Sequence, residues 1–488
     1  MKVAPGFLFL APILATGCGP AGMGSAIVRQ SGPRLPETKP GVNDASRMTT
    51  NRPGPIFRPS GDQATATAEI SALVRSGAKV SISGARHSMG GHTFSEGATV
   101  IDMHTVDSLS LDESRNILTA GAGAEWHEII AFLEKHGRSV SVMQSNNDFT
   151  VGGSISVNCH GWQNDSQPIA STVESFTIIT ADGAVRRCSR RRNPELFSLV
   201  LGGYGLFGVI TEVDLRVVPD AIYRARAEII PTRDYLTTYR KLTKGGNAGM
   251  AYGRISPTPD HFLSEAIITV LEHTDASAPN PPLLPRTKAA LSRMVFRGGG
   301  GSCFGKNFRW AMEKRFGETG GGLHRRNRIL DEPSRLYSNR DRSQAEILHE
   351  YFVPVGNLEA FLTRARKILP EYPEMNLLNI TVRNVERDED SFLRYAGKEV
   401  FGLVMLFNHR RNAEADTTMA ALTQELIDAA LVCGGTYYLP YRPHATPAQF
   451  LRSYPQARRF AALKRKYDPK QVFTNRFWET YLAGLASP

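Results

Sequence analysis

Two periods in the pattern of hydrophobic and polar residues predict the elements of this chain. A period near 3.6 residues, which places apolar side chains on one face of a helix, occurs at 64–75, 126–136, 194–201, 357–367 and 417–431. Short alternating or continuously apolar runs, which are typical of strands, occur at 78–84, 99–103, 117–120, 173–180, 185–188, 209–218, 377–385 and 400–407. The pattern predicts an α+β fold whose second half is an antiparallel sheet covered by helices on one face.

The first 18 residues are typical of an export signal rather than of a folded domain. A single charge at Lys2 precedes the apolar stretch 6–15, which is too short to span a bilayer. Ala15-Thr16-Gly17-Cys18 resembles a bacterial lipobox, although Ala15 stands where Leu is usual. A lipidated Cys18, a simple cleavage and an uncleaved start therefore stay open. Residues 19–55, rich in Gly, Pro, Ser and Asn, are expected to form a flexible tether. We expect an exported protein that is periplasmic or anchored as a lipoprotein.

Composition and charge narrow the class of protein. The 488 residues exceed one ordinary domain, and 41% hydrophobic with 22% charged residues is typical of a globular chain. Five single cysteines without a C-x-x-C pair predict neither a zinc site nor a disulfide framework, and we predict no metal site. The net charge is +11, but no nucleic-acid-binding motif accompanies it, so we expect no nucleic-acid partner.

Most of the positive charge lies in one glycine-rich insertion, 286–342. It holds 14 Lys and Arg against 5 Asp and Glu, an excess of 9. Between its glycine runs, Phe308, Ala311, Met312 and Phe316 have helical spacing. A solvated basic face, contact with anionic lipid headgroups and binding of an acidic substrate all fit this pattern.

Two segments rich in small residues predict a site for a phosphate-bearing ligand. The first is 84–92, directly after a predicted strand, and the second is a predicted loop at 150–161. Small residues leave backbone N–H groups accessible, and such concavities hold phosphate oxygens. Gly203-Tyr-Gly-Leu-Phe-Gly208 matches G-x-G-x-x-G literally, but a helix precedes it and a strand follows it. The dinucleotide fingerprint requires the reverse order, so NAD binding is not predicted there.

Taken together, four motifs resemble the vanillyl-alcohol oxidase and p-cresol methylhydroxylase (PCMH) superfamily of FAD enzymes. They are Gly84-Ala-Arg-His-Ser88, Val151-Gly-Gly153 with Cys159-His-Gly161, Gly202 to Ile210, and Lys466-Tyr-Asp-Pro-Lys-Gln-Val-Phe-Thr-Asn475. Their order and spacing are most similar to the sugar-oxidising branch of alditol, gulonolactone and decaprenylphosphoryl-ribose oxidases. The resemblance implies an FAD-binding PCMH-type domain at 56–220, a substrate domain at 221–435, and a C-terminal segment at 436–488 that returns to the first domain.

The resemblance also implies the residues that contact FAD. Those expected around the cofactor are Ser83, Gly84, Ala85, Arg86, His87, Ser88, Ser145, Thr150, Val151, Gly152, Gly153, Ser156, His160, Gly161, Val209, Ile210 and Tyr438. In the G-x-R-H-S pattern of the alditol-oxidase-like enzymes the histidine is bonded to the flavin C8-methyl carbon, and here that residue is His87. A neutral imidazole is a competent nucleophile for this carbon. His87 as a non-covalent neighbour or a structural residue, and attachment at His92, are the alternatives.

Substrate contacts are expected from a strand and from the tail. The period of two in 377–385 places Asn379, Thr381 and Arg383 on one face, which the resemblance places over the flavin ring; an exposed sheet face is the alternative. In the sugar oxidases a lysine stands thirteen residues before the pair that is here Tyr454-Pro455, and this chain has Tyr441 instead. A phenol with a pKa near ~10 is a poor base without help. Tyr441 is therefore expected to be catalytic or, alternatively, to be a flavin-stacking or structural residue.

We expect an FAD-dependent oxidoreductase that oxidises a CH–OH group of a sugar, polyol or sugar derivative, with O2 or another acceptor. The residues expected to act on the substrate are Tyr441, Arg383, Asn379 and His160. One alternative is a membrane-associated flavin dehydrogenase or epimerase component acting on a polyprenyl-linked sugar with an acceptor other than O2. Another is a non-catalytic binding protein of the cell envelope.

Overall fold

The computed structural model describes residues 43–48, 52–274, 302–316, 322–334, 339 and 341–485. The predicted signal 1–18 with its lipobox, most of the predicted tether 19–55 and the glycine runs of the insertion lie outside the described residues. Six residues of the predicted tether, 43–48, are described and packed against the domain: Asp44 and Ser46 are buried. The prediction of an unstructured tether is therefore wrong for this stretch. Among the described helices, none is long and apolar enough to cross a membrane.

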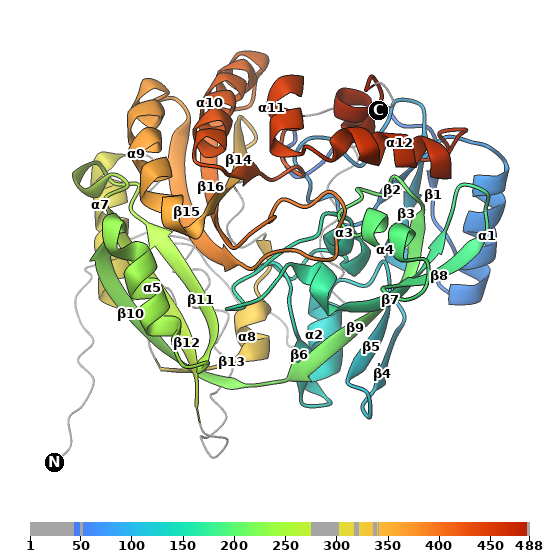
Figure 1. The fold of residues 1–488 in the computed structure, drawn as a ribbon, viewed down its shortest axis with the longest axis horizontal. Helices are drawn as coiled ribbons and strands as arrows, with labels where there is room; N and C mark the ends of the chain where they lie inside the picture. The colour runs from blue at the N-terminus through green and yellow to red at the C-terminus, as the bar shows by residue number, and fades with distance from the viewer. Residues whose placement is uncertain are drawn as a thin grey trace, which may run out of the picture. The chain divides into compact units, whose positions relative to one another are not determined.

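Two sheets form the first half of the molecule (Figure 1). A parallel sheet has the order β1-β3-β2, and a six-stranded sheet has the order β4-β5-β9-β7-β8 with β6 paired to β9. The strands are β1 Ile56–Phe57, β2 Val80–Ser83, β3 Thr99–Asp102, β4 Leu109–Asp112, β5 Ile117–Gly121, β6 Arg138–Val140, β7 Val173–Ile179, β8 Val185–Ser189 and β9 Val209–Pro219. The helices are α1 Gln63–Arg75, α2 Trp126–Glu134, α3 Val151–Ser156 and α4 Pro194–Val200. The predicted hairpin is confirmed, with Gly183 at φ +71° in its turn.

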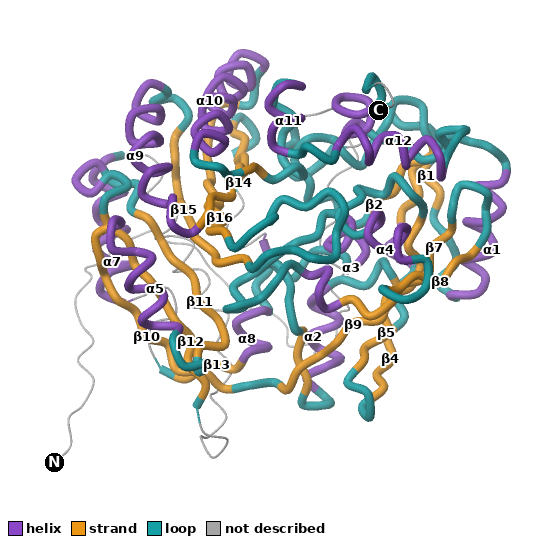
Figure 2. The backbone as a smooth tube through the Cα atoms, in the orientation of Figure 1, coloured by secondary structure: helices purple, strands orange, loops and turns teal. Residues whose placement is uncertain are grey.

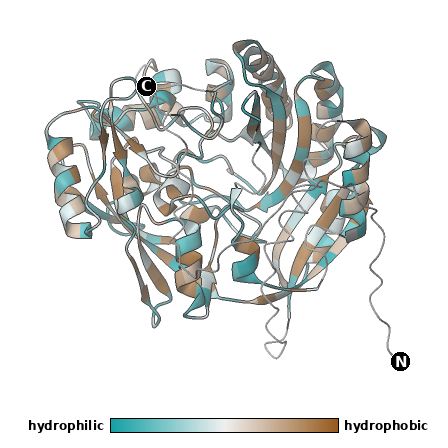
Figure 3. Cartoon of the chain, turned by 180° about the vertical axis from the view of Figure 1, so that it is seen from behind, coloured by the Kyte–Doolittle hydropathy of each residue, from teal (hydrophilic) through white to brown (hydrophobic). Residues whose placement is uncertain are grey.

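An eight-stranded antiparallel sheet forms the second half, in the order β13-β10-β12-β11-β15-β16-β14-β17. Its strands are β10 Ile222–Pro231, β11 Ala248–Ile255, β12 Glu265–His273, β13 Leu323–Arg325, β14 Gln344–Pro354, β15 Asn376–Val385, β16 Val400–Arg410 and β17 Thr436–Tyr437. Hydrophobic residues are frequent along these strands (Figure 3), and β16 is apolar from Val400 to Phe407 apart from Gly402. The α+β fold and the antiparallel sheet covered by helices are confirmed.

Helices lie on both faces of this large sheet, whereas the sequence predicted one. The helices α5 Tyr235–Thr243, α9 Leu358–Ile368 and α10 Ala413–Val432 pack on the outer face. Helix α7 Cys303–Phe316 packs on the opposite face. Gly253 of β11 lies under Tyr235 of α5, so the next residue, Arg254, points to the other face of the sheet. There Arg254 pairs with Glu313 of α7. The amphipathic helix predicted from Phe308, Ala311, Met312 and Phe316 is confirmed as α7, on which Trp310 is buried and Phe308 is 54% exposed.

The C-terminal segment crosses back to the first half of the molecule. After helices α11 Pro447–Ser453 and α12 Ala457–Tyr467, Phe473 forms a bridge with Val80 of β2. The N–H of Val80 donates to Val472 O at 2.8 Å, and the N–H of Thr474 donates to Val80 O at 3.0 Å. The tail thus extends the parallel sheet at the strand that leads into the segment 84–92.

The predicted loop at 150–161 begins instead as helix α3. Thr150 is its N-cap, with the side chain accepting from the N–H of Gly153. Gly152 allows a close approach, since a Cβ there would lie 2.8 Å from Ala122 O. The sequence pattern missed this helix because six residues are too few to establish a helical period. Loops fill the region between the two groups of strands, as Figure 2 shows, and they carry some of the predicted site residues, among them His87, His160 and Tyr441.

Candidate active site

The two segments rich in small residues lie against each other. A Cβ atom added to Gly84 would lie only 2.0 Å from Thr150 Oγ1, so the segment after β2 touches the N-terminus of α3. Gly161 is equally confined, because a Cβ there would lie 1.9 Å from Met143 O. These contacts bring two separate stretches of small residues together, as a site that wraps one ligand requires.

His87 lies between an aromatic ring and a carboxylate. Its imidazole stacks on Phe149, with ring centroids 4.0 Å apart and planes inclined by 15°. Its Nε2 lies 3.9 Å from Asp148 Oδ1, and Asp148 accepts hydrogen bonds from the backbone and hydroxyl of Ser334. The backbone beside it is unusual: Arg86 has φ +59°, and its Nε donates to Ser83 Oγ at 3.1 Å. His87 is therefore held on a constrained loop and remains partly accessible.

A buried polar centre lies under the large sheet. His160 Nε2 is 2.7 Å from Glu350 Oε1, and the two side chains are 4% and 1% exposed. The hydroxyl of Tyr441 donates to Glu350 Oε2 at 3.5 Å. In the sheet, Glu350 of β14 lies opposite Val404 of β16, and Val404 lies opposite Thr381 of β15. The side chain of Glu350 is therefore on the sheet face that carries Asn379, Thr381 and Arg383.

Arg383 joins this sheet face to the first half of the molecule. Its Nη2 donates to Ser145 Oγ at 2.8 Å, and its Nη1 donates to His160 O at 3.4 Å. The neighbouring Asn379 donates to Thr381 Oγ1 at 3.2 Å. The predicted polar face is therefore not simply exposed to water: it contacts the predicted cofactor segments.

Burial decides how the phenols at this centre titrate. Desolvation, followed by the charge of Glu350, raises the pKa of Tyr441 well above its usual value. Burial likewise raises the pKa of Tyr438, whose hydroxyl donates to Val157 O at 2.8 Å. Both phenols therefore stay protonated near neutral pH, and Tyr441 acts as a hydrogen-bond donor to Glu350 rather than as a base.

Glu350 was missed by the sequence reasoning. It stands in β14 as a charged residue in the run His349-Glu-Tyr-Phe-Val353, where a strand buried on both faces is otherwise apolar. A carboxylate in the middle of such a strand needs a partner, and this was the signal available. The strand itself was not predicted, so its face could not be assigned.

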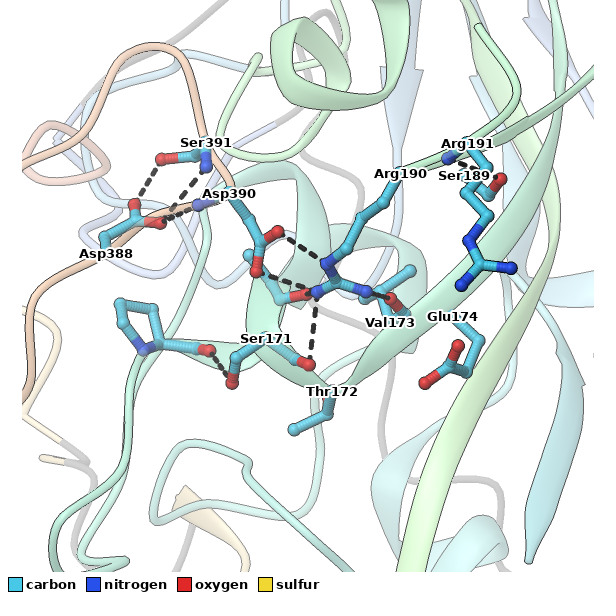
Figure 4. A network of polar contacts seen from close by, with 12 residues as sticks. Ser171, Thr172, Val173, Glu174, Ser189, Arg190, Arg191, Asp388, Asp390 and Ser391 are labelled. Carbon is cyan, nitrogen blue, oxygen red and sulfur yellow. Dashed lines mark hydrogen bonds and ion pairs between the residues drawn. The ribbon is translucent and has the colours of Figure 1, made fainter. Parts of the chain in front are cut away.

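A polar network joins the segment after β8 to the segment between β15 and β16 (Figure 4). Arg190, just after β8, donates to both carboxylate oxygens of Asp390 at 2.7 Å, and the N–H of Asp390 donates to Asp388 Oδ1. Asp388 in turn accepts from the side-chain amide of Asn158 at 2.9 Å. Asn158 is two residues before His160, so the network is connected to the backbone close to His160.

Several predicted cofactor residues lie away from this polar centre. Val209 and Ile210 are buried in β9, where they pair with Ile179 and Ile178 of β7. The hydroxyl of Ser156 donates back to Gly152 O at 2.7 Å within α3. His92 is buried, and desolvation with the nearby Arg442 and Arg476 lowers its pKa to about 3. His92 is thus a neutral core residue, unlike the partly exposed His87.

Buried polar atoms without hydrogen-bond partners cluster where the two halves meet. Within the described ranges, such atoms near the predicted site include Ser88 Oγ, Asn147 Oδ1, His160 Nδ1, Trp162 Nε1, both amide atoms of Gln163 and Arg383 Nε. Unpaired buried polar atoms are costly, and a bound polar ligand satisfies them. Together with the glycines that a Cβ would crowd, they fit a large ligand with a planar polar ring and phosphates, such as FAD. In the described part of the chain, no cluster of His, Cys, Asp and Glu could hold a metal ion.

Comparison with known proteins agrees with this geometry. Residues 61–189 match the family described as FAD binding domain. This part of the chain is similar to the FAD-binding domains of PCMH-type proteins. This FAD-binding part contains the loop with His87, helix α3 and His160, and the cofactor of the superfamily is FAD.

The related proteins have several different activities in their names. Cytokinin dehydrogenase 2 of Arabidopsis thaliana is 31% identical over 185 residues, covering 36% of each chain. L-gulonolactone oxidase of Mus musculus is 30% identical over 152 residues, covering 31% of this chain and 34% of that protein. An FAD-dependent monooxygenase of Arthrobotrys oligospora is 24% identical over 227 residues. The chain thus spans about a third of the length of cytokinin dehydrogenase 2 and L-gulonolactone oxidase.

Proposed function

We propose that this protein is an FAD-dependent oxidoreductase that oxidises a CH–OH group of a small, sugar-like molecule. The observation that carries the proposal is the buried His160–Glu350 pair, with Nε2 and Oε1 2.7 Å apart, adjoining an FAD-binding domain. FAD, when bound, supplies an acceptor for the hydride that leaves the substrate carbon. The related proteins include both dehydrogenases and oxidases, so the substrate class is argued from the site and not from their names.

The site offers separate groups for the proton and for orientation. Glu350 is the proposed base, because its carboxylate accepts from Tyr441 and pairs with His160, which can carry the proton onward. Arg383 and Asn379 lie on the same sheet face and can donate hydrogen bonds to substrate hydroxyl groups. Because Glu350 and His160 are almost fully buried, the proton transfer is shielded from bulk water.

We also propose that FAD is bonded to His87. The imidazole is partly accessible and stacked on Phe149, so its plane is fixed while an edge stays free. The carboxylate of Asp148 lies near Nε2 of His87. It favours loss of the imidazole N–H proton as the bond to the flavin forms.

The test is the flavin content of the purified protein. We expect a yellow protein whose fluorescent flavin stays with the chain after denaturation in SDS, and loss of that fluorescence in His87→Ala. His136→Ala, at an exposed histidine, is the matched control and should keep it. A colourless protein that releases no flavin on denaturation would refute the oxidoreductase. Equal fluorescence in wild type and His87→Ala would refute only the attachment site.

Exposed aromatic side chains on helix α7 support a membrane-associated form of this activity. Phe304 and Phe308 of α7 are 80% and 54% exposed and stack on each other, and basic residues follow on the same helix. Aromatic side chains beside basic ones suit an anionic lipid surface. We propose that α7 contacts such a surface and that the protein is exported, periplasmic or anchored through Cys18.

The electron acceptor is tested by mixing the reduced protein with air: slow reoxidation favours an acceptor other than O2.

A further inference from the structure

A short N-terminal segment covers the loop that carries His87. The described residues 43–48, which we call the strap, precede the FAD-binding match at 61–189. Asp44 in the strap is fully buried, and its carboxylate accepts from the N–H of Gly91 at 2.5 Å. It also accepts from the hydroxyl and N–H of Ser46 at 2.6 and 3.0 Å. A buried carboxylate that accepts three hydrogen bonds is a stable part of the folded structure.

The strap holds the backbone on both sides of His87. The N–H of Ala45 donates to Arg86 O at 3.1 Å and also to Ser88 O at 3.3 Å. Arg86 has φ +59°, a left-handed conformation that a residue with a side chain adopts only when its surroundings hold it. Two independent contacts, Ala45 with the carbonyls and Asp44 with Gly91, therefore maintain the unusual shape of the loop.

The tail holds the same loop from the other side. The N–H of Met89 donates to Pro440 O at 3.1 Å, and a Cβ on Gly90 would lie 2.6 Å from Tyr441 O. The charge of Arg442 acts on Asp44 across this contact. The loop from Arg86 to Gly91 is thus clamped between the strap and the segment that carries Tyr441.

We propose that Asp44 is a positioning residue: through the strap it fixes the loop so that His87 meets the flavin methyl group. This inference rests on the proposed attachment of FAD to His87. Attachment replaces one methyl C–H bond and the ring N–H of His87 by an N–C bond. The two protons and two electrons released reduce the flavin, and O2 then takes them to form H2O2. Nothing in this step uses Asp44 directly, so its effect is on the position of the imidazole.

Asp44→Ala removes the acceptor for Gly91, whereas Asp44→Asn keeps one oxygen in place. We expect hydrogen exchange at the amides of 86–91 to be about tenfold faster in Asp44→Ala, with Asp44→Asn intermediate. We expect the fraction of chains that retain flavin after SDS to fall about fivefold in Asp44→Ala and to recover in part in Asp44→Asn. Asp62→Ala, which removes an exposed carboxylate cap from α1, is the matched control and should match wild type in both measurements.

The two measurements separate this inference from the proposed function. If hydrogen exchange at the amides of 86–91 is as slow in Asp44→Ala as in wild type, the strap does not hold the loop, whatever the flavin content. Faster exchange with unchanged covalent flavin would overturn the positioning role. If wild type carries no covalent flavin, the attachment to His87 fails and the positioning role fails with it, while the exchange data still decide whether the strap holds the loop. If Asp44→Ala does not fold, Asp44→Asn and Ser46→Ala provide the same comparison.

Discussion

At the scale of single residues, charge and burial support the proposed roles at the candidate active site. Glu350 accepts from Tyr441 and lies beside His160, so one carboxylate connects the two residues that the sequence had placed near the substrate. Burial raises the pKa of Tyr441, which rules it out as an unaided base. The roles therefore follow from the neighbours of each group rather than from its residue type.

This assignment predicts unequal effects of two substitutions. Glu350→Gln should lower the rate of flavin reduction by about 100-fold or more, because the proton acceptor is lost. Tyr441→Phe should lower it by only about tenfold, since a donor to Glu350 is removed and the carboxylate remains. Rapid mixing without O2 measures both rates, with Glu113→Gln at an exposed site as the control. A larger loss in Tyr441→Phe than in Glu350→Gln would show that the phenol is the base.

At the scale of elements, α7 has two different faces. Arg309 and Trp310 are buried, and Trp310 Nε1 donates to Glu265 at 2.6 Å, which fixes the helix on the sheet. Phe304 and Phe308 point away from that anchor. The sequence predicted an amphipathic helix here from the spacing of Phe308, Ala311, Met312 and Phe316, but it did not identify Trp310 as the buried anchor.

The exposed face predicts binding to lipid. In a Cys18→Ala protein, which lacks any acyl anchor, we expect sedimentation with vesicles containing phosphatidylglycerol but not with pure phosphatidylcholine. Phe304→Ser with Phe308→Ser should weaken this binding by about tenfold or more, because each ring buries apolar area in the lipid. Ile229→Ser, at an exposed residue of β10, should leave it unchanged. Equal binding by wild type and the double variant would rule out α7 as the contact.

At the scale of the whole molecule, buried neutral histidines connect the tail to the rest of the fold. Burial lowers the pKa of His92 to about 3 and also lowers the pKa values of His349, His409 and His444. His444 lies 3.1 Å from Asp416, which also pairs with Arg442. These residues hold Tyr441 and its neighbours against α10 and β14.

The direction of the pH dependence follows from these shifts. Below about pH 6.5 the unfolded chain takes up protons that the buried histidines of the folded chain do not, so stability falls as the pH falls from 6.5 toward 3. Each such histidine contributes a slope of about 1.4 kcal/mol per pH unit over its range. Urea unfolding at pH 7.5, 6.5 and 5.5 measures the slope, which His92→Gln should reduce and His136→Gln should not. An unchanged slope in His92→Gln would contradict the burial argument.

The sequence by itself determined many of the elements, and its motifs indicated the cofactor. Helical and alternating periods predicted α1, the β7–β8 hairpin, β15 and α10, because those patterns reflect local burial on one face. The small residues around His87 and His160 predicted a phosphate-bearing ligand, and the resemblance of these motifs to PCMH-type enzymes implied that it is FAD. These features depend on neighbours in sequence.

Only the tertiary structure decided which distant groups meet. Glu350 lies beside His160, Arg383 contacts Ser145, and Asp44 holds Gly91, each through contacts between segments far apart in the chain. Asp44 carries no local pattern that marks it, and the apolar run around Glu350 indicates that this carboxylate needs a partner without showing which one. Their burial, and therefore their chemistry, is set by the packing of the two groups of strands around the loops between them.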